Sequence, residues 1–597
     1  MHYGAAVRRM PKVLLIGWDG AGWSQIHPLL DSGAMPNLAR MVENGVMGDV
    51  ATLTPLCSPL LWTSVATGQY ADHHGVLDTL EPDPVTGGVR PVTRASLRIT
   101  QIWNILAQEG LRCQTVGWPV THPAQGPASC VSDGFVHGVP NSVFPQALQS
   151  KIMPLRFHPQ EWTGNELHLF VPQMERIDQD KDKRLAKLGV ILAEAVSVHA
   201  AATTLLESEG WDFSTVWFGA VGRAQELFPS STDDVYKDVV SGVYRFLDLL
   251  LGRLAELAGS EARVMLVSDR TAGESEWRPS TGREVSGLLC AAGPGIEADE
   301  LTFGTGLLDI APTILGLFGF APAPEMAGRA ISEICATAPS RALQDASCAP
   351  PAIPQDTPVT ASELDALALE EFGYTDTIAE ANRSAAEAAA TRRDFHLARV
   401  LLAQGRSDEA IPQFEKLAGK NPALVEVQLY LGHAYFQSAR HAECRAICEA
   451  LLAEAPDSPF AAVSRAHLAI AEGNYEEALA QLRSGPNVYG IAAALDAIVG
   501  DAYLRMGRWD DAAAAFRSAI ETDAGVAAAH QGLAQALLAL GRYREAAEAA
   551  LDAIRLRYDL PGAHDILGRA LNALGLEKAA AGAFAAGEAL SRRMPVA

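Results

Sequence analysis

The sequence predicts an α/β domain with a mostly parallel, buried sheet and helices on both of its faces, followed by an all-α solenoid. Two observations lead to this fold class. Short apolar runs alternate with helix-like segments over the first part of the chain, and a 34-residue repeat occupies the last part. Uninterrupted apolar runs are typical of strands that are buried on both faces. A chain of 597 residues is also too long for a single hydrophobic core.

We place the α/β domain at residues 1–376, a linker helix at 377–390 and the repeats at 391–597. The proline-rich segment 338–358 is expected to form a surface loop or linker. The segment 363–376 is expected to form one more helix of the α/β domain. The expected strands read VLLIGW, STVWFGA, VMLVSD and GLLCAAG.

Two of the expected strands lead directly into an aspartate. Asp19 follows VLLIGW, and Asp269 ends the run VMLVSD. Sheets of this class bind their ligands at the carboxyl ends of the strands. The sequence therefore predicts a site that contains both carboxylates.

Composition limits the classes of partner. The net charge is −24, with 71 acidic against 47 basic residues, which disfavours nucleic acid and anionic membranes because both need a basic face. A small anion site remains compatible with this charge.

The eight cysteines form no CxxC pair, so reduced thiols are expected. With neither a signal-peptide pattern nor an 18-residue apolar run, the expectation is a cytoplasmic protein without a membrane span.

The last part of the chain repeats with a constant spacing. One turn residue recurs every 34 positions, with small residues five positions after it and seven positions before it. The turn residues are Gly405, Ala439, Gly473, Gly507, Gly541 and Gly575. This period is typical of tetratricopeptide repeats, in which each helix pair leaves an apolar face that the next pair covers. We expect about six repeats, with Phe414, Phe516 and Phe584 filling gaps and a groove that docks a helix or an extended peptide.

Several segments of the first part carry a further resemblance. In order they are VLLIGWDGAGW, TLTPLCSPLLWTSVATGQYADHHGVLD, SVHAAATTLLESEGWDFSTVWFGAVGRAQELF, VMLVSDR, GLLCAAGPGI and LLDIAPTILGLFGFAPAPEMAGRAI. Over most of residues 11–332 the chain resembles the alkaline phosphatase superfamily, and within it the type I phosphodiesterase/nucleotide pyrophosphatase branch. The resemblance implies two metal ions, usually zinc, which activate a serine or threonine nucleophile and hold the phosphoryl oxygens.

Three of the seven positions that build this metal centre keep a suitable residue. On the resemblance, Asp19 and Asp269 are metal ligands and Ser58 is the nucleophile and a ligand of the same metal. Ser58 also precedes Pro59, so its hydroxyl is a candidate cap for the helix that starts there. The sequence alone does not separate capping from catalysis.

The other four positions depart from the family pattern. Gly222 stands where an aspartate belongs, and Glu226, Arg270 and Arg283 stand where histidines belong. A glycine offers no ligand atom, and an arginine keeps its proton and has no lone pair to donate. The two-zinc mechanism is therefore not expected to operate with these residues.

Three readings of the altered site remain open. In the first, Arg270 and Arg283 form salt bridges with the two aspartates and plug an abandoned site. In the second, the arginines bind a phosphate-like anion. In the third, one divalent cation, Mg²⁺ or Mn²⁺ rather than Zn²⁺, is held by the oxygens of Asp19, Asp269, Ser58 and Glu226.

Together these features favour a pseudoenzyme without a cofactor, which serves as a scaffold or adaptor through its repeats. The alternative is an active phosphodiesterase-type hydrolase that uses Ser58 and one divalent metal, Mg²⁺, Mn²⁺ or Zn²⁺. His73 and His74 are expected to be structural, and Cys57 is expected to be a buried thiol because no base accompanies it.

Overall fold

The structure is a computed structural model that describes residues 11–593 except for a set of short gaps and one longer gap. The gaps are 209, 230–234, 272–284, 303–304, 336–338, 344–378, 422–423, 455–464, 467, 485–491 and 558–559. The helix expected at 363–376 and most of the proline-rich segment lie outside the described residues. The chain divides into two compact units, whose main parts meet in the sequence between residues 389 and 390.

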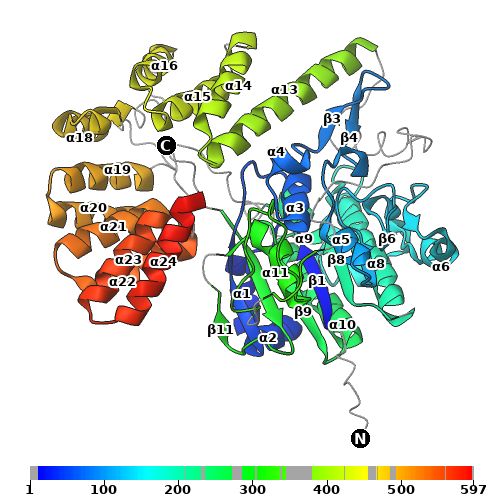
Figure 1. Cartoon of the computed structure of the whole chain (residues 1–597). Coiled ribbons are helices and arrows are strands. Elements are labelled where there is room, and N and C mark those ends of the chain that lie inside the picture. Colours follow the sequence, from blue (N-terminus) through cyan, green and yellow to red (C-terminus); the bar gives the residue numbers. More distant parts are fainter. Residues whose placement is uncertain are drawn as a thin grey trace, which may run out of the picture. The chain divides into compact units, whose positions relative to one another are not determined.

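A ten-stranded sheet forms the centre of the first unit (Figure 1). Its main path runs in the order β11-β2-β10-β9-β1-β8-β5-β6-β7, and β12 pairs with β2. The strands are β1 (Lys12–Trp18), β2 (Gly45–Ala51), β5 (Cys113–Val116), β6 (Ser129–Val131), β7 (Val143–Phe144), β8 (Phe213–Phe218), β9 (Ala262–Val267), β10 (Ser286–Ala292), β11 (Glu300–Leu301) and β12 (Thr305–Gly306). A separate hairpin pairs β3 (Leu80–Pro82) with β4 (Val89–Pro91).

The central strands of the sheet are parallel. β1 lies between β8 and β9 and is parallel to both, and β5 is parallel to β8 and to β6. β10 is antiparallel to β9 and to β2. Gly17 pairs with both Trp217 and Val267, so the residues that follow β1, β8 and β9 emerge at the same edge of the sheet. This edge carries Asp19 and Asp269.

Helices cover both faces of the sheet. Leu14, Ile16 and Trp18 of β1 pack in one core with α1 (Trp23–Asp31), α2 (Pro36–Glu43), α8 (Arg184–Ser208), α9 (Ala220–Leu227) and α10 (Val239–Ala258). On the other face Gly17 is closely approached by Trp62 of α3 (Ser58–Thr67). That helix packs with α5 (Ile102–Gln108) and α11 (Ile310–Leu317). The shorter helices are α4 (Ala71–His74), α6 (Gln149–Ile152) and α7 (Gly164–Leu167). The predicted α/β class is confirmed.

One helix of the first unit is long and apolar enough to cross a membrane. By length and composition alone α8 passes this test, although charged and polar residues interrupt its apolar positions. In the structure 61% of its most apolar window is buried inside the unit. Burial of this kind is what the core helix of a folded domain shows.

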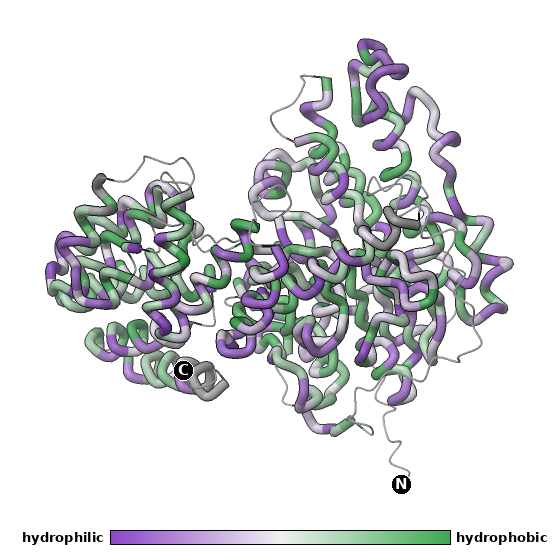
Figure 2. The backbone as a smooth tube through the Cα atoms, turned by 90° about the horizontal axis from the view of Figure 1, so that it is seen from above, coloured by the Kyte–Doolittle hydropathy of each residue, from purple (hydrophilic) through white to green (hydrophobic). Residues whose placement is uncertain are grey.

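The second unit consists of paired helices. They are α13 (Ala379–Ala403), α14 (Ser407–Lys420), α15 (Val425–Gln437), α16 (His441–Glu454), α18 (Tyr475–Ser484), α19 (Ala492–Arg505), α20 (Trp509–Thr522), α21 (Ala527–Ala539), α22 (Tyr543–Leu556), α23 (Pro561–Ala573) and α24 (Glu577–Arg593). Hydrophobic and hydrophilic residues alternate along them (Figure 2). The linker helix expected at 377–390 is continuous with the first helix of the first repeat, because α13 spans both.

The backbone conformation of the six turn residues explains why five of them are glycine. Each turn residue of the repeat has a positive φ, which glycine adopts at little cost. The values are Gly405 74°, Ala439 55°, Gly473 81°, Gly507 73°, Gly541 73° and Gly575 77°. The residues five positions after the turns are buried at helix contacts, namely Ala410, Cys444, Ala478, Ala512, Ala546 and Ala580. The predicted tetratricopeptide arrangement is confirmed.

The large aromatic residues of the repeats differ in how far they are buried. Phe516 fills a gap as predicted, since a Cβ on Gly500 would lie 2.7 Å from its ring and one on Gly532 only 2.2 Å. Phe414 is also fully buried. Phe584 also fills a gap as predicted, since a Cβ on Gly568 would lie 2.6 Å from its ring, although the side chain is 39% exposed. It lies on α24, the last described helix, and no further described helix covers it.

Ala439 provides a test of the turn geometry. Its Cβ is strained at φ 55°, so Ala439→Gly should stabilise the repeat unit by roughly 0.5–1 kcal/mol after the entropy cost of glycine is subtracted. Gly541→Ala at φ 73° is the matched reverse change and should destabilise it by a similar amount. Thermal unfolding followed by far-ultraviolet circular dichroism measures both. Shifts of the same sign in the two variants would show that the turn backbone does not control this stability.

Candidate active site

Asp19 is the centre of the site. It follows β1, and its backbone N–H donates to the carbonyl of Phe218 at 3.0 Å. Its Oδ1 accepts a hydrogen bond of 2.6 Å from Ser58 Oγ and one of 2.8 Å from Trp62 Nε1. The residue is only 6% exposed, so these two bonds satisfy a buried carboxylate oxygen.

Ser58 is positioned by the start of α3. The N-cap of this helix is Cys57, which makes no side-chain capping bond. Ser58 is the first residue of the helix, and its hydroxyl donates to Asp19 instead. The capping role considered for Ser58 is therefore wrong. Cys57 is buried, as expected for a structural thiol.

Asp269 lies beside Asp19 and is fully buried. Its Oδ1 accepts the backbone N–H of Gly20 at 3.0 Å, and its Oδ2 accepts a bond of 2.5 Å from Arg270 Nη1. The same Nη1 lies 3.8 Å from Asp19 Oδ1, and Arg270 Nη2 lies 4.0 Å from Glu226 Oε1. One guanidinium thus faces three carboxylates. The Arg270 side chain is only 12% exposed, so these interactions are poorly screened by solvent.

The charges at this edge are strongly coupled. The pKa of Asp269 is raised to about 7, first by burial and then by the charge of Asp19, while the charge of Arg270 acts in the opposite direction. Burial lowers the pKa of Arg270, but the charges of Asp269, Asp19 and Glu226 outweigh burial and raise it overall. Arg270 therefore stays cationic, and Asp269 is the group that gains or loses a proton near neutral pH.

Close packing leaves no room for a side chain at residue 222, where the family pattern has an aspartate. Gly222 lies in α9, and its N–H donates to the carbonyl of Asp19 at 2.9 Å. A Cβ at residue 222 would lie 2.5 Å from Asp19 Oδ2, closer than such atoms approach. Glu226, one turn later, has a side chain that is 69% exposed. Arg283 lies outside the described residues.

These residues do not fit the two-metal centre that the resemblance implies. Arg270 places a fixed positive charge against the carboxylates that would bind one metal, and Gly222 supplies no ligand for the other. Within the described part of the chain, no three His, Cys, Asp or Glu side chains are grouped so as to hold a metal ion. Ser58 and Trp62 already donate to the Asp19 oxygen, Oδ1, that Arg270 approaches.

Several residues of the site were missed in the sequence. Trp62 donates to Asp19, and its position four residues after Ser58 on one helix is the signal that places both side chains on the same face. The loop after Asp19 is fixed from two other elements. Ser268 Oγ accepts the N–H of Ala21 at 3.0 Å, and Tyr244 OH accepts that of Gly22 at 3.1 Å. No sequence pattern marks these two.

Within the described residues, His73 and His74 form no hydrogen bond or ion pair with the carboxylates of the site. His74 is completely buried, and burial lowers its pKa to about 3. Its Nδ1 accepts the N–H of Val76 at 3.2 Å, so the neutral ring carries its proton on Nε2, which lies 3.0 Å from Ser64 Oγ. His73 is more exposed and lies 3.6 Å from Asp72.

The raised pKa of Asp269 predicts a pH dependence of stability. The folded protein holds a proton on Asp269 between about pH 4 and pH 7, where the unfolded chain has lost it. Stability should therefore fall as pH rises through this window, by up to roughly 4 kcal/mol for an independent group. Asp269→Asn should flatten the slope. Nine of the ten tryptophans precede residue 376, so thermal unfolding followed by tryptophan fluorescence reports this unit. Equal slopes in parent and variant would contradict the prediction.

Comparison with known proteins agrees with both parts of the chain. The profile of the type I phosphodiesterase/nucleotide pyrophosphatase family matches residues 13–278. Tetratricopeptide profiles match residues 401–465 and 500–561. Mouse ectonucleotide pyrophosphatase/phosphodiesterase family member 7 is 30% identical over 151 residues, which cover 23% of this chain and 33% of that protein. The chain thus spans about a third of the length of this relative.

Two solved structures illustrate the likeness of each part. Human ectonucleotide pyrophosphatase/phosphodiesterase 5 is 11% identical, with a TM-score of 0.35, over 51% of this chain and 94% of that one. A thermophilic tetratricopeptide protein of Thermus thermophilus is 23% identical, with a TM-score of 0.28, over 31% of this chain and all of that one. The N-terminal part of this chain is a type I phosphodiesterase/nucleotide pyrophosphatase family domain, and tetratricopeptide repeats follow it.

Proposed function

We propose that this chain is a pseudoenzyme of the phosphodiesterase/nucleotide pyrophosphatase family that acts as a scaffold or adaptor through its repeats. One observation supports this most directly. The guanidinium of Arg270 lies 2.5 Å from Asp269 and 3.8 Å from Asp19, where the resemblance places a histidine that binds metal. A ligand has been replaced by a cation, and the cation is bound to the remaining ligands.

The electrostatics at Arg270 oppose metal binding in two ways. A guanidinium has no lone pair to offer, so it removes a ligand. It also repels a second positive charge, and at about 4 Å this repulsion reaches roughly 4 kcal/mol per unit charge at the effective dielectric constant of a protein site. A divalent ion would have to displace a side chain that is 12% exposed and paired with Asp269. We propose that no cofactor is bound.

Ser58 without metal is a poor nucleophile. A serine hydroxyl needs a strong base or a metal ion to become reactive, and Ser58 donates its hydrogen bond to the carboxylate of Asp19. A carboxylate is a much weaker base than an alkoxide, so accepting this hydrogen bond does not by itself make the serine reactive. The hydrogen bond holds the start of α3 against the end of β1, which is a structural role.

The charges also argue against an anion ligand at Arg270. Asp269, Asp19 and Glu226 all face this one guanidinium, so an incoming phosphate would meet more negative than positive charge. Of the three readings, the salt-bridge plug has the strongest support. We therefore do not assign the phosphate-like anion to Arg270.

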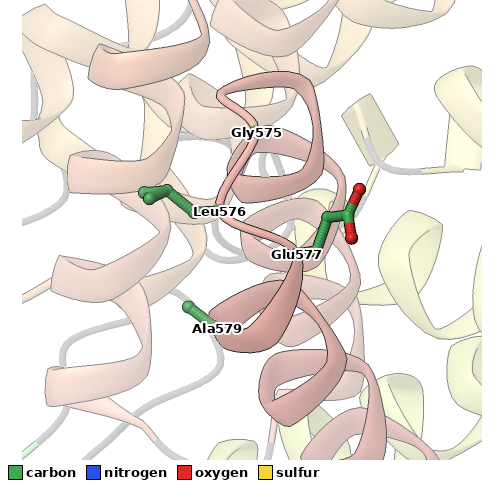
Figure 3. A pocket seen from close by; sticks show the side chains of 4 residues that line it. All are labelled: Gly575, Leu576, Glu577 and Ala579. Carbon is green, nitrogen blue, oxygen red and sulfur yellow. The ribbon is translucent and has the colours of Figure 1, made fainter.

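The repeats are the proposed interaction part. Exposed large apolar side chains occur on them, with Trp509 37%, Tyr543 39% and Leu576 52% exposed. A hollow of about 690 Å³ opens at the turn between α23 and α24, where Leu576 and Ala579 project to one side and Glu577 to the other (Figure 3). Apolar side chains and hollows on helical repeats suit a protein or peptide partner, and we propose the cytoplasm as the location.

The rival function is hydrolysis of phosphodiesters or related esters by Ser58 with one divalent metal. Its support is that Asp19, Ser58 and Asp269 are brought together at one edge of the sheet. Metal content separates the two proposals, because the rival requires a tightly bound ion and the pseudoenzyme does not.

We expect the purified protein to carry less than about a tenth of an ion per chain after purification without chelator and dialysis against Mg²⁺, Mn²⁺ or Zn²⁺. Elemental mass spectrometry measures this directly. Bis(4-nitrophenyl) phosphate should be hydrolysed at the same background rate by the parent protein and by Ser58→Ala. About one ion per chain, together with turnover that Ser58→Ala abolishes, would establish the rival. Two ions would restore the ordinary family mechanism.

A further inference from the structure

The buried carboxylates of the site need a positive charge. Asp269 is fully buried and Asp19 is 6% exposed, and two carboxylates in such a position repel each other and lose their hydration. A single atom, Nη1 of Arg270, reaches both of them, and Nη2 reaches Glu226. Within the described residues, Arg270 is the one basic side chain that forms an ion pair with Asp19 or Asp269.

The remaining bonds to these carboxylates come from neutral donors. Asp19 Oδ1 accepts from Ser58 and Trp62, and Asp269 Oδ1 accepts from Gly20. Neutral donors satisfy lone pairs but do not cancel two negative charges. Among the described residues, Arg270 is therefore the side chain that compensates the charges of Asp19 and Asp269. The one basic residue of the neighbouring helix α9, Arg223, is paired with Glu194.

We propose that Arg270 is a tethered structural cation that takes over the charge-balancing role of a metal ion at this edge of the sheet. This inference rests on the proposed function, since it requires that the parent protein binds no metal. It explains why both aspartates persist in a site that lacks the other ligands. The carboxylates anchor Gly20, Ser58 and Trp62 to the ends of β1 and β9. The positive charge of Arg270 offsets the repulsion between these buried carboxylates.

The proposal predicts that a variant without the charge of Arg270 gains a site for a soluble cation. Without Arg270, Asp269 Oδ2 loses the guanidinium, which also lies 3.8 Å from Asp19 Oδ1, the oxygen that accepts from Ser58 Oγ. An all-oxygen set of this kind suits a hard divalent cation such as Mn²⁺ or Mg²⁺ better than Zn²⁺. A soluble cation should then replace the tethered one.

Three variants of the full chain test this by thermal unfolding followed by tryptophan fluorescence at pH 8. Arg270→Met keeps most of the side-chain volume and removes the charge, and it should lower the unfolding temperature by about 10 °C in the presence of chelator. Arg270→Lys keeps the charge and should lower it much less. Arg270→Met combined with Asp269→Asn removes one charge of each sign and should recover most of the loss.

The cation arm uses Mn²⁺ alone, at millimolar concentration. Mn²⁺ should raise the unfolding temperature of Arg270→Met and leave that of the parent, of Arg270→Lys and of the double variant unchanged, because only a folded state with a cation site gains from the ion. If Arg270→Met does not fold, recovery of folding in the double variant supports the proposal.

Several results would overturn the inference. Equal losses in Arg270→Met and Arg270→Lys would show that packing or hydrogen bonding, and not charge, is what Arg270 contributes. No recovery in the double variant would show the same. Failure of Mn²⁺ to stabilise Arg270→Met would leave Arg270 as an ordinary ion-pair partner. These results leave the proposed function intact, whereas stabilisation of the parent by Mn²⁺ accompanied by ester hydrolysis would refute the proposed function itself.

Discussion

The ion pair between Arg270 and the two buried aspartates is the interaction on which the altered site depends. Parallel pairing of β1 with β9 brings Asp19 and Asp269 to one edge of the sheet, and both residues are buried. Charges in such a place must be paired or neutralised. The guanidinium that pairs with them belongs to the residue directly after Asp269, so the compensating charge is local in sequence.

This arrangement separates two properties that a metal centre combines. In the family, metal ions both balance the carboxylates and drive the chemistry. Here Arg270 balances charge but has neither a vacant coordination position nor a lone pair, and Gly222 packs against Asp19 where another ligand belongs. The sheet is present, and Ser268 and Tyr244 hold the backbone after Asp19.

Much of the architecture was predictable because its signals are periodic or local. Buried strands appear as apolar runs, the two aspartates follow strands directly, and the 34-residue spacing marks turns that require positive φ, which even Ala439 adopts. The contacts of the site were less predictable, because they depend on packing between distant segments. The hydroxyl of Ser58 turns to Asp19 and not to its own helix, and the crowding of Gly222 against Asp19 has no sequence signature. The exposure of Phe584 likewise follows from its place on the last described helix.

The central claim is that Arg270 occupies the place of a metal ion. The most direct measurement is a crystal structure of the parent protein soaked in Mn²⁺, with anomalous diffraction recorded at the manganese absorption edge. The account predicts no anomalous peak between Asp19 and Asp269 and an Arg270 guanidinium in contact with both. A peak coordinated by the two aspartates and Ser58, with Arg270 turned away, would contradict it.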